Sequence, residues 1–536
     1  MAPPARPSTY DALGRVGLPA PVSELAARRW DVVVVGGGHN GLTAAAYVAR
    51  AGRSVLVLER REQIGGACTL ERPFADPRFV MSPCAYLVGL LHPIVIDELD
   101  LPRYGYSTYV CDPTQWTPFS DGTSLTQWLD DDRTAKEVHA LAPGDVDGYV
   151  AYVELFRRIA TGLRAGGDPA RDTWIGDAPD RAALEELFAG DPEGREVLFE
   201  ASIADVVEQH VRDERLRTAL HGQGIIGTFA GPRDRGTAWI HAMHSLGLIG
   251  GWSYVEGGMG RVSFCLADAS RDAGAVIAAG LPVAAIVPGE GVRLDGGELI
   301  RATAVVSNAD PVRTLALCEG AVPDAFRARV ESWRCESPVV KVNCALDRLP
   351  TFIAARDRRQ HVYRAQVEIG RGVDETQAAY ESCRRGEPAP EWCEVYFQTS
   401  YDASVAPPGA HTMSVFAQYA PYTLRDGTWD ARRDEIGDRV LDAIARFAPD
   451  VGDCVIEREV LGAPDVEDRI GLTGGHIFQG ECLPDQMWDR RFASRTPIPG
   501  LYLCGAATHP GGSVIAVNGR NTGRAVIADL GSTREA

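Results

Sequence analysis

Three glycines near the start of the chain have the spacing of a phosphate-binding loop. Gly36, Gly38 and Gly41 form the pattern G-x-G-x-x-G, with Asn40 between the last two as a further contact candidate. In this pattern the first glycine permits a tight turn, the second lets the backbone approach a pyrophosphate, and the third lets a helix pack on a strand. The first turn of that helix attracts phosphate oxygens through its free N–H groups and its dipole. The loop predicts a dinucleotide site, and the alternative is a glycine turn without a ligand.

An acidic side chain stands where the ribose of such a dinucleotide is expected. Glu59 lies 18 residues after Gly41, and its carboxylate can accept hydrogen bonds from the adenosine ribose. A negative charge at this position disfavours a 2′-phosphate, although Arg60 follows directly. Gly65 and Gly66 come next and offer a second backbone contact with the cofactor.

The far end of the chain favours FAD over NAD. Residues 500–504 are predicted to form a strand, and residues 505–515 form a loop of small residues before a final helix. Such a loop can admit a ribityl chain and direct helix N–H groups at a flavin carbonyl. No second complete G-x-G-x-x-G unit follows a strand, so a separate NAD domain is not expected.

Three titratable residues are candidates for catalysis. A flavin carries the difficult step, and the protein supplies shape, charge and proton transfer. His509 lies in the C-terminal loop, where it can orient the flavin or relay a proton, or simply fix the loop backbone. His476 follows two glycines, and Glu256 precedes the 257–260 turn, where capping is the alternative role.

A glycine-rich aromatic stretch, residues 228–254, is a candidate wall for a long apolar tunnel, with ordinary core packing as the alternative. The candidate lining residues are Trp239, His241, His244 and Tyr254. His241 and His244 are one helical turn apart, so one helix face can carry both. No third ligand accompanies them, and no metal site is expected.

Lys341 is one of only two lysines, the other being Lys136. It lies in the middle of an expected strand, between Val340 and Val342. In flavin amine oxidases a lysine holds a water near the flavin N5 atom, and this role is a hypothesis for Lys341.

The elements around these residues predict an α/β fold. Residues 31–35 are a β-branched run typical of a buried parallel strand, followed by a helix at 42–51 and a second strand at 54–58. Further strands are expected at 304–307 and 339–346, with a hairpin at 291–300. Helices are expected at 145–162, 195–217, 261–273, 432–447 and 517–530.

Length and composition limit the class of protein. The 536 residues suggest two to four domains or one large two-lobed fold, and 45% hydrophobic with 24% charged residues is typical of globular proteins. The net charge of −19 excludes a phosphate-tracking nucleic-acid binder and disfavours an anionic membrane. The 12 cysteines contain no C-x-x-C pair, which favours reduced thiols in a cytoplasmic protein. The first 29 residues lack an apolar signal core, and no apolar run is long enough to span a membrane.

Five stretches together resemble a known group of flavoproteins. Residues 31–66, 254–260, 304–311, 471–478 and 500–523 are similar to the phytoene desaturase, carotenoid isomerase and retinol saturase group. Within it, the chain most resembles the branch called pyridine nucleotide-disulfide oxidoreductase domain-containing protein 2. These stretches span nearly the whole chain in the expected order.

The resemblance implies a split FAD-binding Rossmann-type domain with an inserted α+β substrate domain. The N-terminal tail would be 1–29, the FAD-binding domain 30–72, 254–311 and 495–536, and the substrate domain 73–253 and 312–494. By this match Gly36, Gly38, Gly41, Glu59 and Gly66 would hold the ADP half, and Val283 and Asn308 would lie beside the cofactor. The flavin half would be held by Gly505, Ala506, Gly512, Ser513, Val514 and Ile515. Ala506 stands where many relatives carry an acid, as is common in the desaturase branch.

The expected function is an FAD-dependent oxidoreductase that transfers hydride from a C–C bond of an apolar, polyene or isoprenoid-like substrate to flavin N5. The substrate would be free or carrier-bound, and oxygen or a quinone would reoxidise the flavin. Flavin-dependent isomerisation, amine oxidation and a non-enzymatic flavin-fold scaffold are the alternatives. The expected location is cytoplasmic, and a peripheral membrane contact stays open. The sequence does not indicate the oligomeric state.

Overall fold

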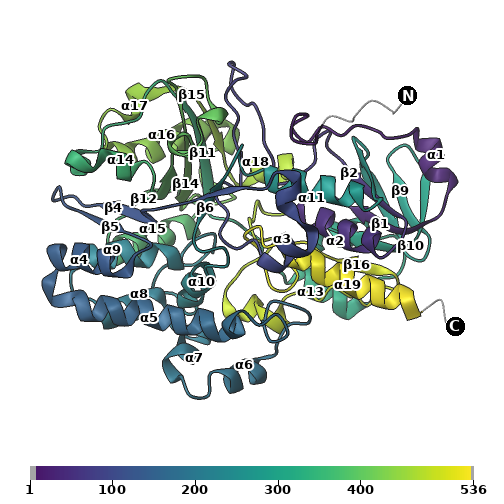
Figure 1. Ribbon diagram of the computed structural model, residues 1–536, viewed down its shortest axis with the longest axis horizontal. Helices are drawn as coiled ribbons and strands as arrows, with labels where there is room; N and C mark the ends of the chain where they lie inside the picture. The colour runs from purple at the N-terminus through teal and green to yellow at the C-terminus, as the bar shows by residue number, and fades with distance from the viewer. Residues whose placement is uncertain (1–7, 533–536) are drawn as a thin grey trace.

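The computed structural model describes the backbone of residues 8–532 and the side chains of 8–355 and 361–531. Figure 1 shows two lobes, one around the sheet that contains β1 and β2 and the other around the sheet that contains β11 and β14. A layer of helices, α4 to α10, lies below the second sheet. No helix within residues 8–532 is both long and apolar enough to cross a bilayer.

The first sheet is built on the β-branched strand expected near the N-terminus. β1 (Trp30–Val35) contains four consecutive buried valines, as expected for a parallel strand that is covered on both faces. It pairs in parallel with β2 (Val55–Glu59) on one side and β10 (Leu299–Ser307) on the other. The order is β7-β2-β1-β10, with β16 (Leu501–Leu503) beside β10 and β7 (Val276–Ala279) at the edge. The start of β10 also pairs antiparallel with β9 (Gly291–Leu294), which pairs with β8 (Val283–Val287).

Three helices cover one face of this sheet. α2 (His39–Arg50) packs against both α11 (Arg261–Asp272) and α19 (Val517–Ser532). The contact between α2 and α19 is close, because a Cβ on Gly519 would lie 2.2 Å from the carbonyl oxygen of Asn40. The opposite face is covered by α1 (Val22–Ala27), α12 (Pro311–Leu317) and α13 (Asp324–Glu331). This arrangement confirms the expected Rossmann-type α/β fold.

The second sheet has the order β15-β11-β14-β13-β12-β4-β5 and is antiparallel except where β12 meets β4. Its strands are β4 (Gln115–Pro118), β5 (Ser124–Gln127), β11 (Val339–Leu346), β12 (Gln366–Ile369), β13 (Trp392–Tyr396), β14 (His411–Gln418) and β15 (Val455–Leu461). The face that carries Val342, Val395 and Val415 packs on α16 (Trp429–Ala445). Side chains alternate along a strand, so the opposite face carries the intervening residues.

The helices that follow β5 and precede β6 in sequence lie below the second sheet. They include α4 (Asp131–Leu141), α5 (Val146–Leu163), α6 (Arg181–Leu187), α7 (Pro192–Phe199), α8 (Ile203–His210), α9 (Glu214–His221), η4 (Gly222–Gly224) and α10 (Thr237–His244). The helical stretch expected at 195–217 is confirmed as helical but is divided among α7, α8 and α9. Capping explains the breaks, since the side chains of Ser202 and Asp213 accept hydrogen bonds from the first turns of α8 and α9.

A two-stranded ribbon, in which β3 (Thr108–Val110) pairs with β6 (Ser253–Val255), packs beside the second sheet, where Tyr254 clusters with Tyr396 of β13. β6 continues across the predicted boundary between residues 253 and 254, and the segment boundaries themselves stay predictions. The remaining α-helices are α3 (Pro93–Leu99), α14 (Arg359–Val362), α15 (Val373–Arg384), α17 (Val451–Cys454) and α18 (Ala463–Ile470). The remaining 3-10 helices are η1 (Leu101–Tyr104), η2 (Pro143–Asp145), η3 (Ala165–Gly167), η5 (Ile353–Arg358), η6 (Gln398–Ser400), η7 (Ala403–Val405), η8 (Pro484–Gln486) and η9 (Trp488–Arg490).

The close packing of α19 on α2 predicts that Gly519→Ala destabilises the protein. The added methyl group would overlap the Asn40 carbonyl, and overpacking of this kind costs about 1–3 kcal/mol. Gly531→Ala on the same helix is the matched control, since no atom lies within 4 Å of its Cβ position. Thermal unfolding should show a lower Tm for Gly519→Ala only, and equal Tm values for both variants would contradict the packing argument.

Candidate functional site

Four strands of the first sheet end at one edge, because they run parallel. Gly36 follows β1, Glu59 ends β2, Asn308 follows β10 and Gly505 lies just beyond β16. In open α/β sheets, ligands bind beyond the carboxyl ends of the strands. The fold therefore brings together residues from the start, middle and end of the chain.

The glycine loop has the geometry that its sequence predicts. Gly36 has a φ of +98°, which few other residues adopt. A Cβ on Gly41 would lie 2.3 Å from the Gly36 carbonyl oxygen, and one on Gly38 would lie 2.7 Å from Asn308 Nδ2. Asn40 is buried in the first turn of α2, and its Oδ1 has no partner among the described residues.

Glu59 is held by backbone donors. Its Oε2 accepts a hydrogen bond of 2.8 Å from Gly37 N, and its Oε1 accepts one of 2.9 Å from Arg61 N. Burial raises the pKa of this carboxyl. Each carboxylate oxygen keeps a further lone pair for a ribose hydroxyl. The Arg60 guanidinium instead donates to the carbonyl oxygens of Asp468 and Arg469, at 2.8 and 2.9 Å.

The other predicted contacts of the ADP half surround this edge. Gly65 N donates to Gly37 O at 2.9 Å, and Gly66 follows with a φ of +59°. Asn308 N donates to Val35 O at 2.8 Å and so fixes Asn308 beside the glycine loop. Val283 begins β8 just after Leu281, whose N–H donates to Glu59 O.

The C-terminal loop is unusual in its backbone. Ser513, Val514 and Ala516 have φ values of +75°, +55° and +63°. Positive φ is a true outlier for a β-branched residue such as Val514, and such strain concentrates at functional sites. Ile515 O accepts a hydrogen bond of 3.1 Å from His92 N, which ties the loop to the start of α3.

A buried arginine holds this loop against the segment 478–482. Arg491 is 2% exposed, and its Nη2 donates to Ala506 O at 2.6 Å and to Phe478 O at 2.8 Å. Its Nη1 donates to Glu481 O at 3.0 Å. Gly505 and Gly512 permit the close approach, since a Cβ on either would overlap Gln479 or Phe478.

One cavity, which we call the inner cavity, is lined by residues from both the N-terminal and the C-terminal parts of the chain. It has a volume of about 140 Å³ and is bounded by His39 and Cys68 from the first segment and by Ala506, Ser513 and Val514 from the last. Its other walls come from the second sheet and from residues 84–87, 223–252 and 461–478. A dinucleotide that binds at Glu59 and the start of α2 would have its far end in this cavity. The donor set and the glycine cradle therefore fit FAD.

The second sheet turns a row of unusual side chains toward this cavity. Lys341 pairs with Phe416, Phe416 pairs with Glu394, and Glu394 pairs with Glu368, across four neighbouring strands. Neighbouring strands are about 4.8 Å apart, so two strand spacings separate Lys341 from Glu394. Lys341, Phe416 and Glu394 line the inner cavity.

Glu394 accepts hydrogen bonds from four side chains. Tyr396 OH lies at 2.6 Å, Gln223 Nε2 at 2.9 Å and Tyr86 OH at 3.4 Å, and Gln366 Nε2 is the fourth donor. The Lys341 Nζ lies 4.1 Å from the centre of the Tyr86 ring, so the Tyr86 side chain contacts both Lys341 and Glu394.

Lys341 and Glu394 titrate near neutral pH. Burial lowers the pKa of Lys341 to about 7 and raises the pKa of Glu394 to about 7. Lys341 Nζ also donates to Ser414 Oγ. Groups whose pKa values lie near 7 can accept or donate a proton at physiological pH.

Comparison with known families decides the identity. Residues 129–522 match the family described as "Flavin containing amine oxidoreductase". Residues 34–89 match the family described as "NAD(P)-binding Rossmann-like domain". The chain belongs to the flavin containing amine oxidoreductase family. FAD is its cofactor, and the chain is an FAD-dependent oxidoreductase, as the sequence predicts.

The chain is also similar to individual proteins of known sequence or structure. The chain is 34% identical to mouse pyridine nucleotide-disulfide oxidoreductase domain-containing protein 2, over 94% of each chain. It is 26% identical to one subunit of the limonene dehydrogenase of Castellaniella defragrans, over 94% of this chain and 95% of that protein. The structure of cyclohexylamine oxidase from Brevibacterium oxydans superposes with a TM-score of 0.58 at 18% identity, over 95% of this chain and 100% of that one. The expected group and branch are confirmed.

The three catalytic candidates predicted from the sequence do not line the inner cavity. His509 Nε2 bonds Thr173 O at 2.8 Å, and burial lowers its pKa to about 4. His476 is fully buried, with its Nδ1 accepting from Phe478 N at 3.2 Å, and burial lowers its pKa to about 3. Glu256 is exposed on the surface. None of the three is among the described residues that line the inner cavity, and their catalytic roles stay predictions.

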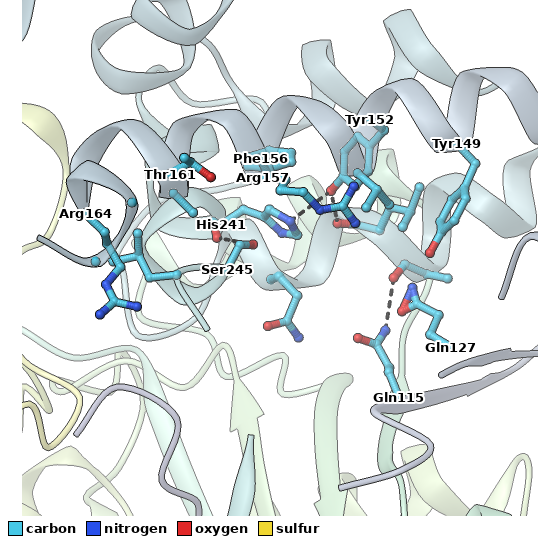
Figure 2. Close-up of a pocket in the computed structure, with 18 residues that line it drawn as sticks. Gln115, Gln127, Tyr149, Tyr152, Phe156, Arg157, Thr161, Arg164, His241 and Ser245 are labelled. Atoms are coloured by element: carbon cyan, nitrogen blue, oxygen red, sulfur yellow. Dashed lines mark hydrogen bonds between the residues drawn. The ribbon is translucent and has the colours of Figure 1, made fainter. Parts of the chain in front are cut away.

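The four predicted lining residues divide among different places. His244 lines the inner cavity, and Tyr254 lines a small space beside Tyr86. His241 lines a separate, outer cavity (Figure 2). Trp239 is buried in the core against Trp488, with ring centres 4.5 Å apart. Within the described chain, no group of three or more His, Cys, Asp or Glu residues is arranged to hold a metal.

Sequence reasoning missed Glu394, Tyr86 and Gln223. A signal was present for Glu394, because a carboxylate in the middle of an apolar strand is rare unless it has partners. Glu394 lies in β13, between Cys393 and Val395. Nothing in the sequence places Tyr86 or Gln223 beside it.

The position of Glu59 predicts that Glu59→Gln weakens FAD binding. The variant replaces one acceptor oxygen with a donor that faces a backbone N–H, and a hydrogen bond to a charged group contributes about 1.5–3 kcal/mol. Titration of the apoprotein with FAD should give a Kd about tenfold higher or more. Glu62→Gln, at an exposed position nearby, is the matched control and should leave the Kd unchanged. An unchanged Kd for Glu59→Gln would remove Glu59 from the binding site.

Proposed function

We propose that this oxidoreductase dehydrogenates a CH–CH bond of an apolar, isoprenoid-like substrate. The observation that carries the proposal is the inner cavity, whose walls are mainly apolar and which has one polar cluster. Its apolar walls include Ile226, Val339, Leu461, Leu472, Ile477 and Phe478. The limonene dehydrogenase polypeptide, a relative over nearly the whole chain, is named for a hydrocarbon isoprenoid.

The chain's own residues supply exclusion of water and proton transfer. Dehydrogenation breaks two C–H bonds, of which one leaves as hydride and the other as a proton while a C=C bond forms. FAD, held by Glu59 and the glycine loop, would supply the hydride acceptor, and oxygen or a quinone would take up the electrons. We assign the proton acceptor to Lys341 Nζ, since its depressed pKa leaves much of it uncharged at neutral pH. At the other end of the polar cluster, Tyr86 OH donates a hydrogen bond to Glu394.

Anaerobic mixing of the FAD-loaded protein with limonene and with longer isoprenoids tests the proposal. Loss of the visible flavin absorbance together with formation of a new double bond would support dehydrogenation. Product formation without loss of absorbance would favour the isomerase alternative. Loss of absorbance with cyclohexylamine only would favour amine oxidation. Absence of any reaction with all of these compounds would count against the proposal and favour the scaffold alternative.

The proposed base predicts a specific pH dependence. Lys341 must be unprotonated to accept a proton, so the rate of flavin bleaching should rise with pH and reach half its maximum near pH 7. Lys341→Met keeps the volume but removes the base, and should lower the rate about a hundredfold or more and remove the rise.

Lys136→Met is the matched control, because Lys136 is the other lysine of the chain and is exposed on α4. It should keep the rate and the pH profile of the unmodified protein. A Lys341→Met variant with full FAD content and an unchanged pH profile would exclude Lys341 as the base.

A further inference from the structure

A second cavity opens beside the inner one, between α5 and α10. We call it the outer cavity; its volume is about 540 Å³. Figure 2 shows side chains of α5 along one wall, His241 and Ser245 from the α10 region behind them, and Gln115 and Gln127 opposite. It opens near the exposed residues Arg157, Gly166 and Gly167.

A third cavity, of about 220 Å³, has walls in common with both the outer and the inner cavity. It shares Gln115 and Ser245 with the outer cavity, and it shares His244, Trp252 and Gln366 with the inner one. Gln223 lines all three. The three cavities therefore lie in a row from the surface to the site beside Lys341, with Gln223 as a wall common to all of them.

The two ends of this row differ in chemistry. The inner cavity is mainly apolar, whereas the outer cavity exposes hydroxyl and amide groups. The side chains of Gln127, Tyr149 and Thr161 line the outer cavity, and no hydrogen-bond partner for them exists in the described chain. These groups are available to a ligand as donors and acceptors.

The charges around the outer cavity are compensated. Arg157 pairs with Asp131 at 2.6 Å and with Glu154 at 2.7 Å, and Arg164 lies 3.7 Å from Asp172. None of the described residues that line it is an acid. Burial lowers the pKa of His241 to about 3, so this ring is neutral. The two arginines and the three carboxylates beside them leave no excess positive charge, so the outer cavity suits a neutral oxygen better than an anion.

We propose that the outer cavity binds the polar end of an elongated substrate, a hydroxyl or carbonyl group, while its apolar chain extends past Gln223 into the inner cavity. This rests on the proposed function for the chemistry at the inner end. It adds that the substrate is an amphipathic chain longer than the inner cavity alone can hold, and that this chain enters between α5 and α10.

The test compares ligands of different length on the FAD-loaded protein. The probes are geraniol, with ten carbons, geranylgeraniol, with twenty, and geranylgeranoic acid. Binding is measured from the change in the visible flavin spectrum under anaerobic conditions, which needs no turnover. Geranylgeraniol should bind more tightly than either geraniol or the acid.

Ala160→Trp fills the outer cavity from α5, and should weaken geranylgeraniol at least tenfold relative to geraniol. Val150→Trp is the matched control, since Val150 is on the same helix, is 51% exposed and does not line the cavity. It should keep the length preference of the unmodified protein. FAD content and Tm identify a variant that has lost its fold, and Ser245→Trp fills the cavity from the α10 side should that occur.

The outcomes separate this inference from the proposed function. Length-dependent binding that Ala160→Trp abolishes, without flavin bleaching by any probe, would support the outer site while counting against dehydrogenation. Bleaching by geraniol and geranylgeraniol that Ala160→Trp slows equally would support dehydrogenation and overturn the outer site. Tighter binding of the acid would overturn the neutral-oxygen assignment. Absence of a spectral change with every probe would overturn the outer site.

Discussion

The pairing of β10 with both β1 and β16 is the constraint on which the site depends. Its backbone hydrogen bonds join the segment that begins at Trp30 to the segment that ends the chain. Because all three strands run parallel, the loops after them share one edge. The glycine loop and the strained loop at 513–516 therefore meet at one cavity, although more than 450 residues separate them in sequence. Packing of α19 on α2 and the hydrogen bonds of Arg491 then hold the second loop in place.

The second sheet provides both a core face and a cavity face, because side chains alternate between the two faces along each strand. One face is an apolar surface on α16, which gives the sheet most of its burial. The other face carries Lys341, Gln366, Glu368 and Glu394, which are buried polar groups. Burying such groups is costly unless each has partners. Four donors to Glu394 and the contacts of Lys341 with Ser414 and Tyr86 reduce that cost, and the same burial brings both pKa values toward neutrality.

Much of the nucleotide half could be predicted from the sequence, because its signals are local. The valine run, the glycine spacing and the acid at the end of the second strand lie within about thirty residues of one another, and they specify a βαβ unit. The loop after residue 504 was also identifiable from its small residues. The polar cluster was not, because it depends on the register between β11, β13 and β14, which are far apart in the chain. His509 and Glu256 illustrate the same limit: their residue types suit catalysis, but only tertiary structure shows one bonded to Thr173 and the other on the surface.

The alternation along β11, β13 and β14 also bears on how this protein can change over evolutionary time. Side chains on a strand alternate with a period of two, so an insertion or deletion of one residue exchanges the two faces. In these strands such a change would place Lys341 or Glu394 in the apolar contact with α16 and present valines to the cavity. Fold and chemistry would be lost in one step. Length variation among descendants of this sequence should therefore be confined to connections such as 399–410, while these three strands change only by substitution.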